Sequence, residues 1–184
     1  MRAIVTSALR QATIVIGIAL AWHGSFALND WLFVELAHSG RANWIFLPAL
    51  LRPLAILLFG GVGAIGLVLR AYITVQGEVA VGQWHAAMLA LGSGVAPWLG
   101  VALGRRLLSI PKTLSGLRGI DIFIICALCA LANALLLNLY LWSVGRLNDD
   151  LLQILTVFIG DLFGAAIGLF VLSSILGLAV LRKG

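Results

Sequence analysis

The stretch WIFLPALLRPLAILLFGGVGAIGLVLRAYITVQG, residues 44–77, is an almost unbroken apolar run of 34 residues. About 20 residues of helix cross the roughly 30 Å hydrocarbon core of a bilayer, so the run is too long for one crossing. Four glycines, at positions 60, 61, 63 and 66, interrupt its middle. Because glycine accepts the backbone conformations of a tight reversal, the run predicts two short helices, about 44–60 and 61–77.

The whole chain shares this apolar character. Of its 184 residues, 62% are hydrophobic and 10% are charged, and the mean hydropathy is +1.11. Soluble domains are about half apolar and roughly a quarter charged, and a domain of about 150 residues still exposes roughly 30% of its unfolded surface. The composition therefore excludes a water-soluble domain and predicts an integral membrane protein.

Long apolar stretches predict a single membrane domain, residues 1–184, whose fold class is all-α: a polytopic bundle of six transmembrane helices. The predicted spans are about 11–34, 44–60, 61–77, 82–104, 120–143 and 151–181. The first stretch has the charged and apolar parts of a signal peptide but no clear cleavage site, so a retained signal-anchor helix is expected.

The basic residues predict the orientation. With six spans, eight of the twelve Lys and Arg residues fall on one side, which the positive-inside rule assigns to the cytoplasm, whereas five spans would divide them. These eight are Arg2, Arg10, Arg105, Arg106, Lys112, Arg118, Arg182 and Lys183. Both termini are then cytoplasmic, and a multi-pass protein of a bacterial cytoplasmic (inner) membrane is expected. The net charge of +5 is read as this topology signal facing anionic lipid, so no nucleic-acid partner is expected.

Three charged residues lie inside the predicted spans. Counting 1.5 Å per residue from the span ends places Arg52, Arg70 and Asp161 each roughly 12–15 Å deep. Charges at this depth are costly unless they are paired, and they face the bundle interior or a wet cavity. Three readings stay open: a closed ion pair that locks helix packing, a cluster in which one arginine holds an anionic ligand or whose protonation changes when a signal arrives, and an arginine that extends to the surface. Arg52 is favoured as the ligand-facing arginine, because nearby prolines interrupt its helix and free backbone groups.

Small residues recur every four positions around the acid. Gly160, Gly164 and Gly168 form one helix face, which allows close backbone approach and predicts helix packing there. Packing within the chain and packing between two copies both fit this pattern.

The sequence offers no constellation typical of an enzyme. It contains no nucleophile elbow, no P-loop and no H-E-x-x-H motif, and Cys126 and Cys129 lie in an apolar helix as small buried residues. No histidine has a second histidine at i+3 or i+4. We therefore expect no catalytic residues, no metal site, no cofactor and no enzymatic activity.

Three segments together resemble the first type of bacterial membrane-associated sensor domain (MASE). They are WIFLPALLRPLAILLFG, AAMLALGSGVAPWLGVALGRRLL and FIGDLFGAAIGLFVL, in this order, and Gly160, Asp161 and Gly164 match the G-D-x-x-G motif of that family. The resemblance covers about residues 44–172 and implies a role in perceiving a signal. Such domains usually precede a soluble output domain, and the chain stops two residues after Arg182, so a free-standing, sensor-like version is expected.

The sequence leads to one functional hypothesis and two alternatives. The first is a sensor-like integral membrane protein in signal transduction that binds a small anionic ligand or a membrane partner, or forms a homo-oligomer, through its midplane polar cluster. The alternatives are a substrate-binding or transport subunit of a small-molecule uptake system and a structural subunit of a larger membrane complex.

Overall fold

The computed structural model of the chain describes residues 2–33, 35, 37–39, 42–76, 82–111, 114, 116–146 and 150–181. Its six α-helices are α1 (Arg2–Phe33), α2 (Leu51–Phe59), α3 (Gly61–Gln76), α4 (Gln83–Leu107), α5 (Gly119–Ser143) and α6 (Asp150–Leu181). A short 3-10 helix, η2 (Leu47–Leu50), leads into α2. Two very short antiparallel strands, β1 (Ala37–Ser39) and β2 (Ala42–Asn43), come before η2. The predicted all-α class is confirmed, with this small hairpin as the one addition in the described part of the chain.

Four helices are long and apolar enough to cross a membrane: Val5–Phe33, Gln83–Leu107, Gly119–Ser143 and Leu152–Ile175. A multi-pass membrane protein is thereby supported. The other two predicted spans are the shorter apolar helices Leu47–Phe59 and Gly61–Val75, each under 18 residues. Length and composition thus support four spans, and the two short spans stay a prediction. Positions 34 and 77, which end two predicted spans, and the basic residues Lys112, Arg182 and Lys183 lie outside the described residues.

The break predicted within residues 44–77 lies at Gly60. Its φ of +57° is in the left-handed region, which favours glycine, and α2 ends there while α3 begins at the next residue. The two helices then fold back on each other, since a Cβ at Gly63 would overlap the carbonyl of Ala55. This reversal excludes a single continuous helix through the apolar run.

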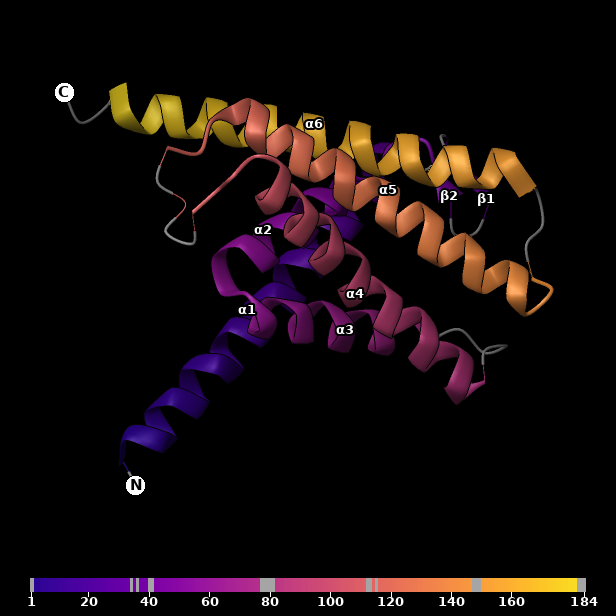
Figure 1. Cartoon of the computed structure of the whole chain (residues 1–184), viewed down its shortest axis with the longest axis horizontal. Helices are drawn as coiled ribbons and strands as arrows, with labels where there is room; N and C mark the ends of the chain where they lie inside the picture. The colour runs from indigo at the N-terminus through magenta and orange to yellow at the C-terminus, as the bar shows by residue number, and fades with distance from the viewer. Residues whose placement is uncertain are drawn as a thin grey trace.

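The long helices lie side by side in sequence order. α3 packs on α4, α4 on α5 and α5 on α6, and α1 packs on α3. In Figure 1 the end of α4, the start of α5 and the end of α6 lie at the left, while the ends of α3 and α5 and the starts of α4 and α6 lie at the right. The N-terminal part of α1 projects from the bundle at the lower left.

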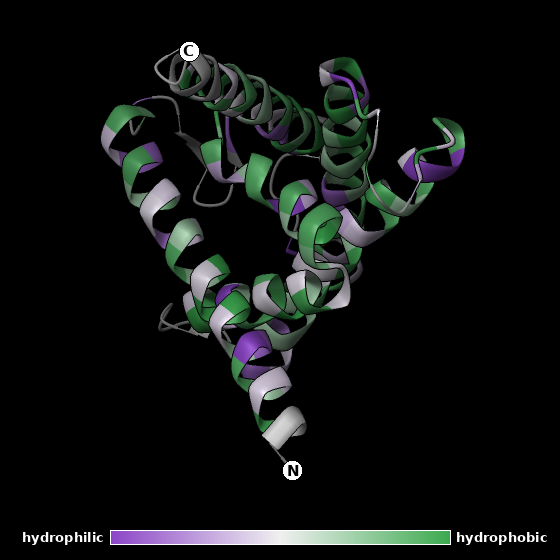
Figure 2. Cartoon of the chain, turned by 90° about the vertical axis from the view of Figure 1, so that its left-hand side faces the viewer, coloured by the Kyte–Doolittle hydropathy of each residue, from purple (hydrophilic) through white to green (hydrophobic). Residues whose placement is uncertain are grey.

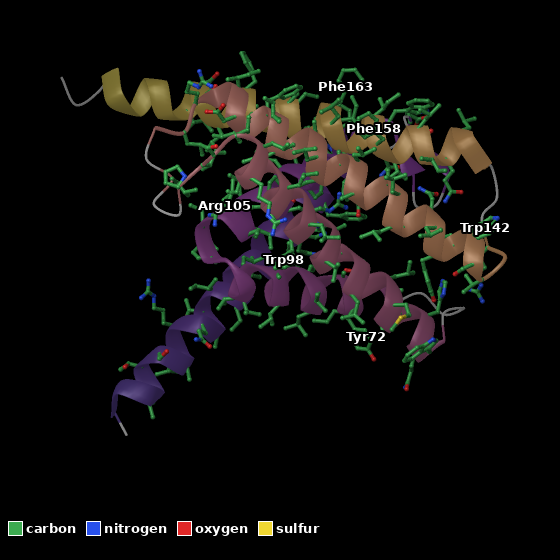
Figure 3. All side chains as sticks on the ribbon, viewed as in Figure 1. Tyr72, Trp98, Arg105, Trp142, Phe158 and Phe163 are labelled. Atoms are coloured by element: carbon green, nitrogen blue, oxygen red, sulfur yellow. The ribbon has the colours of Figure 1, made fainter. Side chains whose placement is uncertain are left out.

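Apolar side chains cover the outside of the bundle as well as its interior. Most of each helix carries hydrophobic residues (Figure 2), and every α-helix exposes large ones, such as Leu20, Ile65 and Phe163. Phe163 points away from the other helices in Figure 3. A helix that is hydrophobic all round belongs in an apolar solvent, so this surface fits lipid.

Glycines bring α4 and α5 close together. A Cβ at Gly100 would come within 2.6 Å of the Cα of Cys129, and one at Gly104 within 2.7 Å of the Ile125 side chain. Small residues at such contacts replace the hydrophobic drive that lipid does not supply. The close packing holds α5, and with it Asn133, at a fixed distance from α4.

The start of α5 is fixed by an acidic residue. The Arg118 N–H donates a hydrogen bond of 2.9 Å to Oδ2 of Asp121, and the guanidinium Nη2 donates one of 3.1 Å to Oδ1. The hydrogen bond that the Arg118 guanidinium donates to Asp121 raises the pKa of this guanidinium above its ordinary value. A carboxylate in the first turn also suits the positive end of the helix dipole. Arg105 lies toward this end of the bundle, and Trp142 lies at the opposite end (Figure 3).

Candidate functional site: a polar cavity inside the helix bundle

A stretch of non-helical backbone, residues 43–46, runs beside the middle of α6. Two backbone N–H groups at the end of this stretch donate hydrogen bonds to residues far away in the sequence. The Phe46 N–H donates to the carbonyl oxygen of Gly160 at 3.0 Å, and the N–H of Leu47, the next residue, donates to Oδ1 of Asn29 at 2.8 Å. Asn29 is almost fully buried, with 1% of its surface exposed. Irregular backbone at membrane depth is tolerated only where protein buries it or where it lines a cavity. Here Asn29 and Gly160 provide the partners.

The glycine face of α6 packs against this same stretch and its continuation. A Cβ at Gly160 would overlap the carbonyl of Asn43, and a Cβ at Gly164 would overlap that of Phe46. At Gly168 it would come within 2.7 Å of the Leu50 side chain. The stripe therefore makes its contact within the chain, against the irregular segment and η2.

Arg52 and Asp161 form a buried ion pair between α2 and α6. Nη1 of Arg52 donates a hydrogen bond to Oδ2 of Asp161, across 109 residues of sequence, and Nδ2 of Asn133 donates to the same oxygen at 2.7 Å. The Arg52 guanidinium also lies over the rings of Trp22 and Phe46, 5.3 Å from each centroid. Three groups thus compensate this arginine: a carboxylate, and the electron-rich faces of two aromatic rings.

Arg70 on α3 is buried to the same degree but is not compensated in the same way. It is 7% exposed, against 8% for Arg52. Its guanidinium lies 5.9 Å from the centroid of Phe26, and no carboxylate among the described residues pairs with it. The Nε atoms of both arginines have no hydrogen-bond partner, so the ion pair is what distinguishes them. Of the two arginines, the sequence favoured Arg52 as ligand-facing. In the structure Asp161 forms its ion pair with Arg52, and Arg70 is the one of the two arginines without an ion pair.

All three charged residues line one cavity of about 230 Å³. Its polar lining includes Asn43, Arg52, Arg70, Ser93, Asn133 and Asp161, and its aromatic lining is Trp22, Phe26, Phe46 and Tyr140. Most of the remaining wall is aliphatic, from α3, α4, α5 and α6.

The cavity reaches deep along the helices. Tyr140 lies three residues before the end of α5, about 5 Å along the axis, and Asn133 lies ten residues before it, about 15 Å. Near the shallow end, Nδ1 of His85 and the hydroxyl of Tyr140 are 2.6 Å apart, with ring centroids separated by 5.1 Å. The charged residues thus lie toward the inner part of a pocket whose shallow end is lined by Tyr140, which contacts His85.

The sequence indicated some of these residues and missed others. Asn133 and Asn29 each carry a signal in the sequence, because each is a polar residue in an apolar helix. Trp22, Phe46 and Tyr140 carry no such signal, because an aromatic residue in an apolar helix is ordinary. Their place in the cavity wall follows only from the path of the chain.

The electrostatics of the cavity are simple. The charge of Arg52 is balanced by Asp161, so Arg70 leaves the described lining with one net positive charge. Within the described part of the chain, no group of three His, Cys, Asp or Glu side chains lies close enough to hold a metal ion. The arrangement suits binding of a negatively charged group beside aromatic rings.

Comparison of the chain with protein-family models, with curated proteins and with solved structures finds no match.

Proposed function

We propose that the chain is a sensor-like membrane protein that binds a small ligand in the cavity and communicates its bound state to a membrane partner. The observation that carries the proposal is Arg70, a buried arginine that lines the cavity without an ion pair. An uncompensated charge in a low-dielectric interior costs several kcal/mol. A protein that keeps one beside an open volume has a use for it, and binding a ligand is the simplest.

The way the cavity is built supports a response to binding. Its walls come from α1, the irregular segment, and the helices that follow, so a ligand would contact α1 through Trp22 and α3 through Arg70 at once. The N-terminal part of α1 leaves the bundle and exposes Leu9, Ile16 and Leu20. We propose that a ligand bridging α1 and α3 changes how this projecting part is held. A membrane partner, or a second copy of the chain, would read that change.

Two motifs behind the resemblance to membrane-associated sensor domains are in contact. The glycines of the G-D-x-x-G motif on α6 pack against the segment that leads into Pro48, and Asp161 of the same motif pairs with Arg52. Motifs far apart in sequence that together form one cavity wall are what a shared sensor architecture would require. This supports the sensor proposal, in which the chain has no enzymatic activity of its own.

A substrate-binding or transport subunit is the second candidate. Broken helices and irregular backbone near the bilayer midplane are typical of transporter substrate sites, and residues 43–46 have this character. Movement of a substrate across vesicles that contain the purified chain alone would favour transport. Binding without movement would favour the sensor.

For the membrane arrangement we propose six crossings with both termini in a bacterial cytoplasm, the two short helices α2 and α3 forming one inward and one outward crossing. Cysteine introduced at Ser143, at the end of α5, should react with a membrane-impermeant reagent from outside intact cells. Cysteine at Ser109, just after α4, should react only after permeabilisation. The reverse pattern would mean that the orientation is inverted. Reaction of both cysteines from outside would contradict the proposed six crossings.

The ligand proposal is tested by filling the cavity. Gly92 lines it, and a Cβ there meets nothing within 4 Å, so Gly92→Leu occupies the space without a clash at its base. Gly17→Leu on the exposed face of α1 is the matched control. Native mass spectrometry of protein purified from its own membrane should detect a bound small molecule in the wild type and in Gly17→Leu, but not in Gly92→Leu. Absence of any bound molecule from all three would count against the proposal and favour a purely structural subunit.

A further inference from the structure

The lining of the cavity restricts the class of ligand. This inference rests on the proposed function, because it concerns what the same cavity holds. One net positive charge remains after Arg52 and Asp161 are paired, so a ligand with a single negative charge neutralises the site. A dianion would leave one charge unbalanced, and a cation would add to the positive charge of Arg70.

Aromatic rings line the cavity beside the arginines. Phe26 lies under the Arg70 guanidinium, and the Phe46 ring is 6.2 Å from that of Phe26 and 5.9 Å from that of Trp22, each edge to face. A ligand that brings its anionic group to Arg70 would therefore place its body near these rings and the aliphatic side chains opposite. Such surroundings favour an apolar body over a hydroxylated one, because each buried hydroxyl would need a hydrogen-bond partner.

The size of the cavity sets the scale of the ligand. At the roughly 30 Å³ that each molecule occupies in liquid water, about 230 Å³ corresponds to on the order of eight waters. An organic molecule packs more densely than water, so a ligand with about ten non-hydrogen atoms fits.

We infer that the cavity binds a compact monoanion, one carboxylate or phosphate-like group on an apolar body, with the anionic group on Arg70 and the body against Phe26 and Phe46. Arg52 forms the adjoining wall together with Asp161 and Asn133. Its ion pair with Asp161 keeps it from competing for the anion. Two sources share this chemistry: a free organic acid and the head region of an anionic lipid. Both place one negative group at the end of an apolar body.

Three probes with the same ring and a similar length separate the effect of charge: phenylacetate is an anion, phenylacetamide a neutral amide and phenethylamine a cation. The full chain is placed in nanodiscs of zwitterionic phosphatidylcholine, and binding is measured by equilibrium dialysis. Phenylacetate should bind at least tenfold more tightly than phenylacetamide, and phenethylamine should show no saturable binding. Acetate, which lacks the ring, should bind much more weakly than phenylacetate.

Arg70→Gln should abolish the tenfold preference for the anion, and Arg70→Lys should restore part of it. Arg106→Gln, which removes an exposed arginine at the end of α4, should leave the preference unchanged. If Arg70→Gln does not fold, the comparison of the three probes on the wild type still decides the charge preference. Replacing phosphatidylcholine by phosphatidylglycerol distinguishes the sources: competition with phenylacetate assigns the anion to the membrane, and its absence assigns it to a free acid.

Equal binding of all three probes, or tighter binding of the amine, would overturn the inference. So would an anion preference that persists in Arg70→Gln, because the anion would then lie elsewhere. If the probes bind equally but Gly92→Leu abolishes their binding, the cavity is a ligand site and only the monoanion assignment fails. If no probe binds, the monoanion assignment fails as stated, and the mass-spectrometric test decides the proposed function separately.

Discussion

The cavity has two unlike walls. On the α6 side, the charge of Asp161 is paired with Arg52, and a Cβ at Gly164 would overlap the backbone of the facing segment. On the α3–α4 side, Arg70 has no ion pair among the described residues, and a Cβ at Gly92 would meet nothing within 4 Å. The two arginines are equally buried, so depth alone does not explain the difference. One wall is complete without a ligand, whereas the other has both the unbalanced charge and the space.

The largest effect is expected from removing the acid of the complete wall. Asp161→Asn leaves Arg52 buried without a counter-charge, and breaking a buried pair in this way costs about 3–5 kcal/mol. Arg70→Gln removes a charge that has no ion pair, so the free energy of unfolding should stay the same or increase. Unfolding in mixed detergent micelles, followed by far-ultraviolet circular dichroism, measures both.

A double-mutant cycle tests whether the loss belongs to the pair. The double variant Arg52→Gln, Asp161→Asn should recover part of the loss, because no lone charge remains. The combination of Asp161→Asn with Arg70→Gln should be additive within about 0.5 kcal/mol. Coupling of Asp161 to Arg70 rather than to Arg52 would reverse the assignment of the two walls.

The next effect concerns the second donor to Asp161. Asn133→Ala removes the 2.7 Å hydrogen bond to its carboxylate, and hydrogen bonds to charged groups contribute about 1.5–3 kcal/mol. Asn138 is the matched control, since it is buried on the same helix but donates only to the carbonyl of Ala134, one turn earlier. The same unfolding experiment should show a smaller loss for Asn138→Ala. Equal losses would mean that truncation of a buried side chain, and not the bond to Asp161, sets the cost.

Part of this site could be predicted from the sequence. The helical rise fixes how deep a residue lies, so counting along the spans placed Arg52, Arg70 and Asp161 at one level. It did not assign the partners, because the direction in which a side chain points depends on how each helix is rotated. The irregular backbone of residues 43–46 was also beyond the sequence. An apolar run that contains a proline can be helical from its first residue, so its composition does not mark these residues as irregular. The hydrogen bond from Leu47 to Asn29 involves a different helix, α1, which the local sequence does not indicate.

The fold shows the same limit. The run of four glycines between positions 60 and 66 was identified as the break because glycine favours a reversal, and the two helices separate at Gly60. The start of the second predicted span was placed too early, because hydropathy counts apolar residues and does not distinguish a helix from an extended approach to it. Residues 44–46 are apolar and were included in a span, yet η2 begins only at Leu47.

The glycine stripe allows a third test of the complete wall. Gly164→Ala adds one methyl group where the carbonyl of Phe46 already lies, and overpacking costs about 1–3 kcal/mol. Gly17→Ala on α1 meets nothing within 4 Å and serves as the control. Thermal unfolding in detergent should show a clear loss for Gly164→Ala and none for Gly17→Ala. Matching results at the two positions would contradict close contact along α6.

The smallest effect is expected on the open wall, and it has the opposite sign. Gly92 lies inside α4, where glycine costs roughly 0.8–1 kcal/mol relative to alanine, because its backbone has more freedom to lose. The space beside it accepts a methyl group, so Gly92→Ala should raise the free energy of unfolding by up to about 1 kcal/mol. A methyl group also takes little of the cavity, and phenylacetate binding should therefore weaken far less than in Gly92→Leu. Thermal unfolding and equilibrium dialysis on the same preparation measure the two quantities together. A loss of stability at Gly92 like that at Gly164 would mean that this wall is as tightly packed as the other, and the contrast between the two walls would fail.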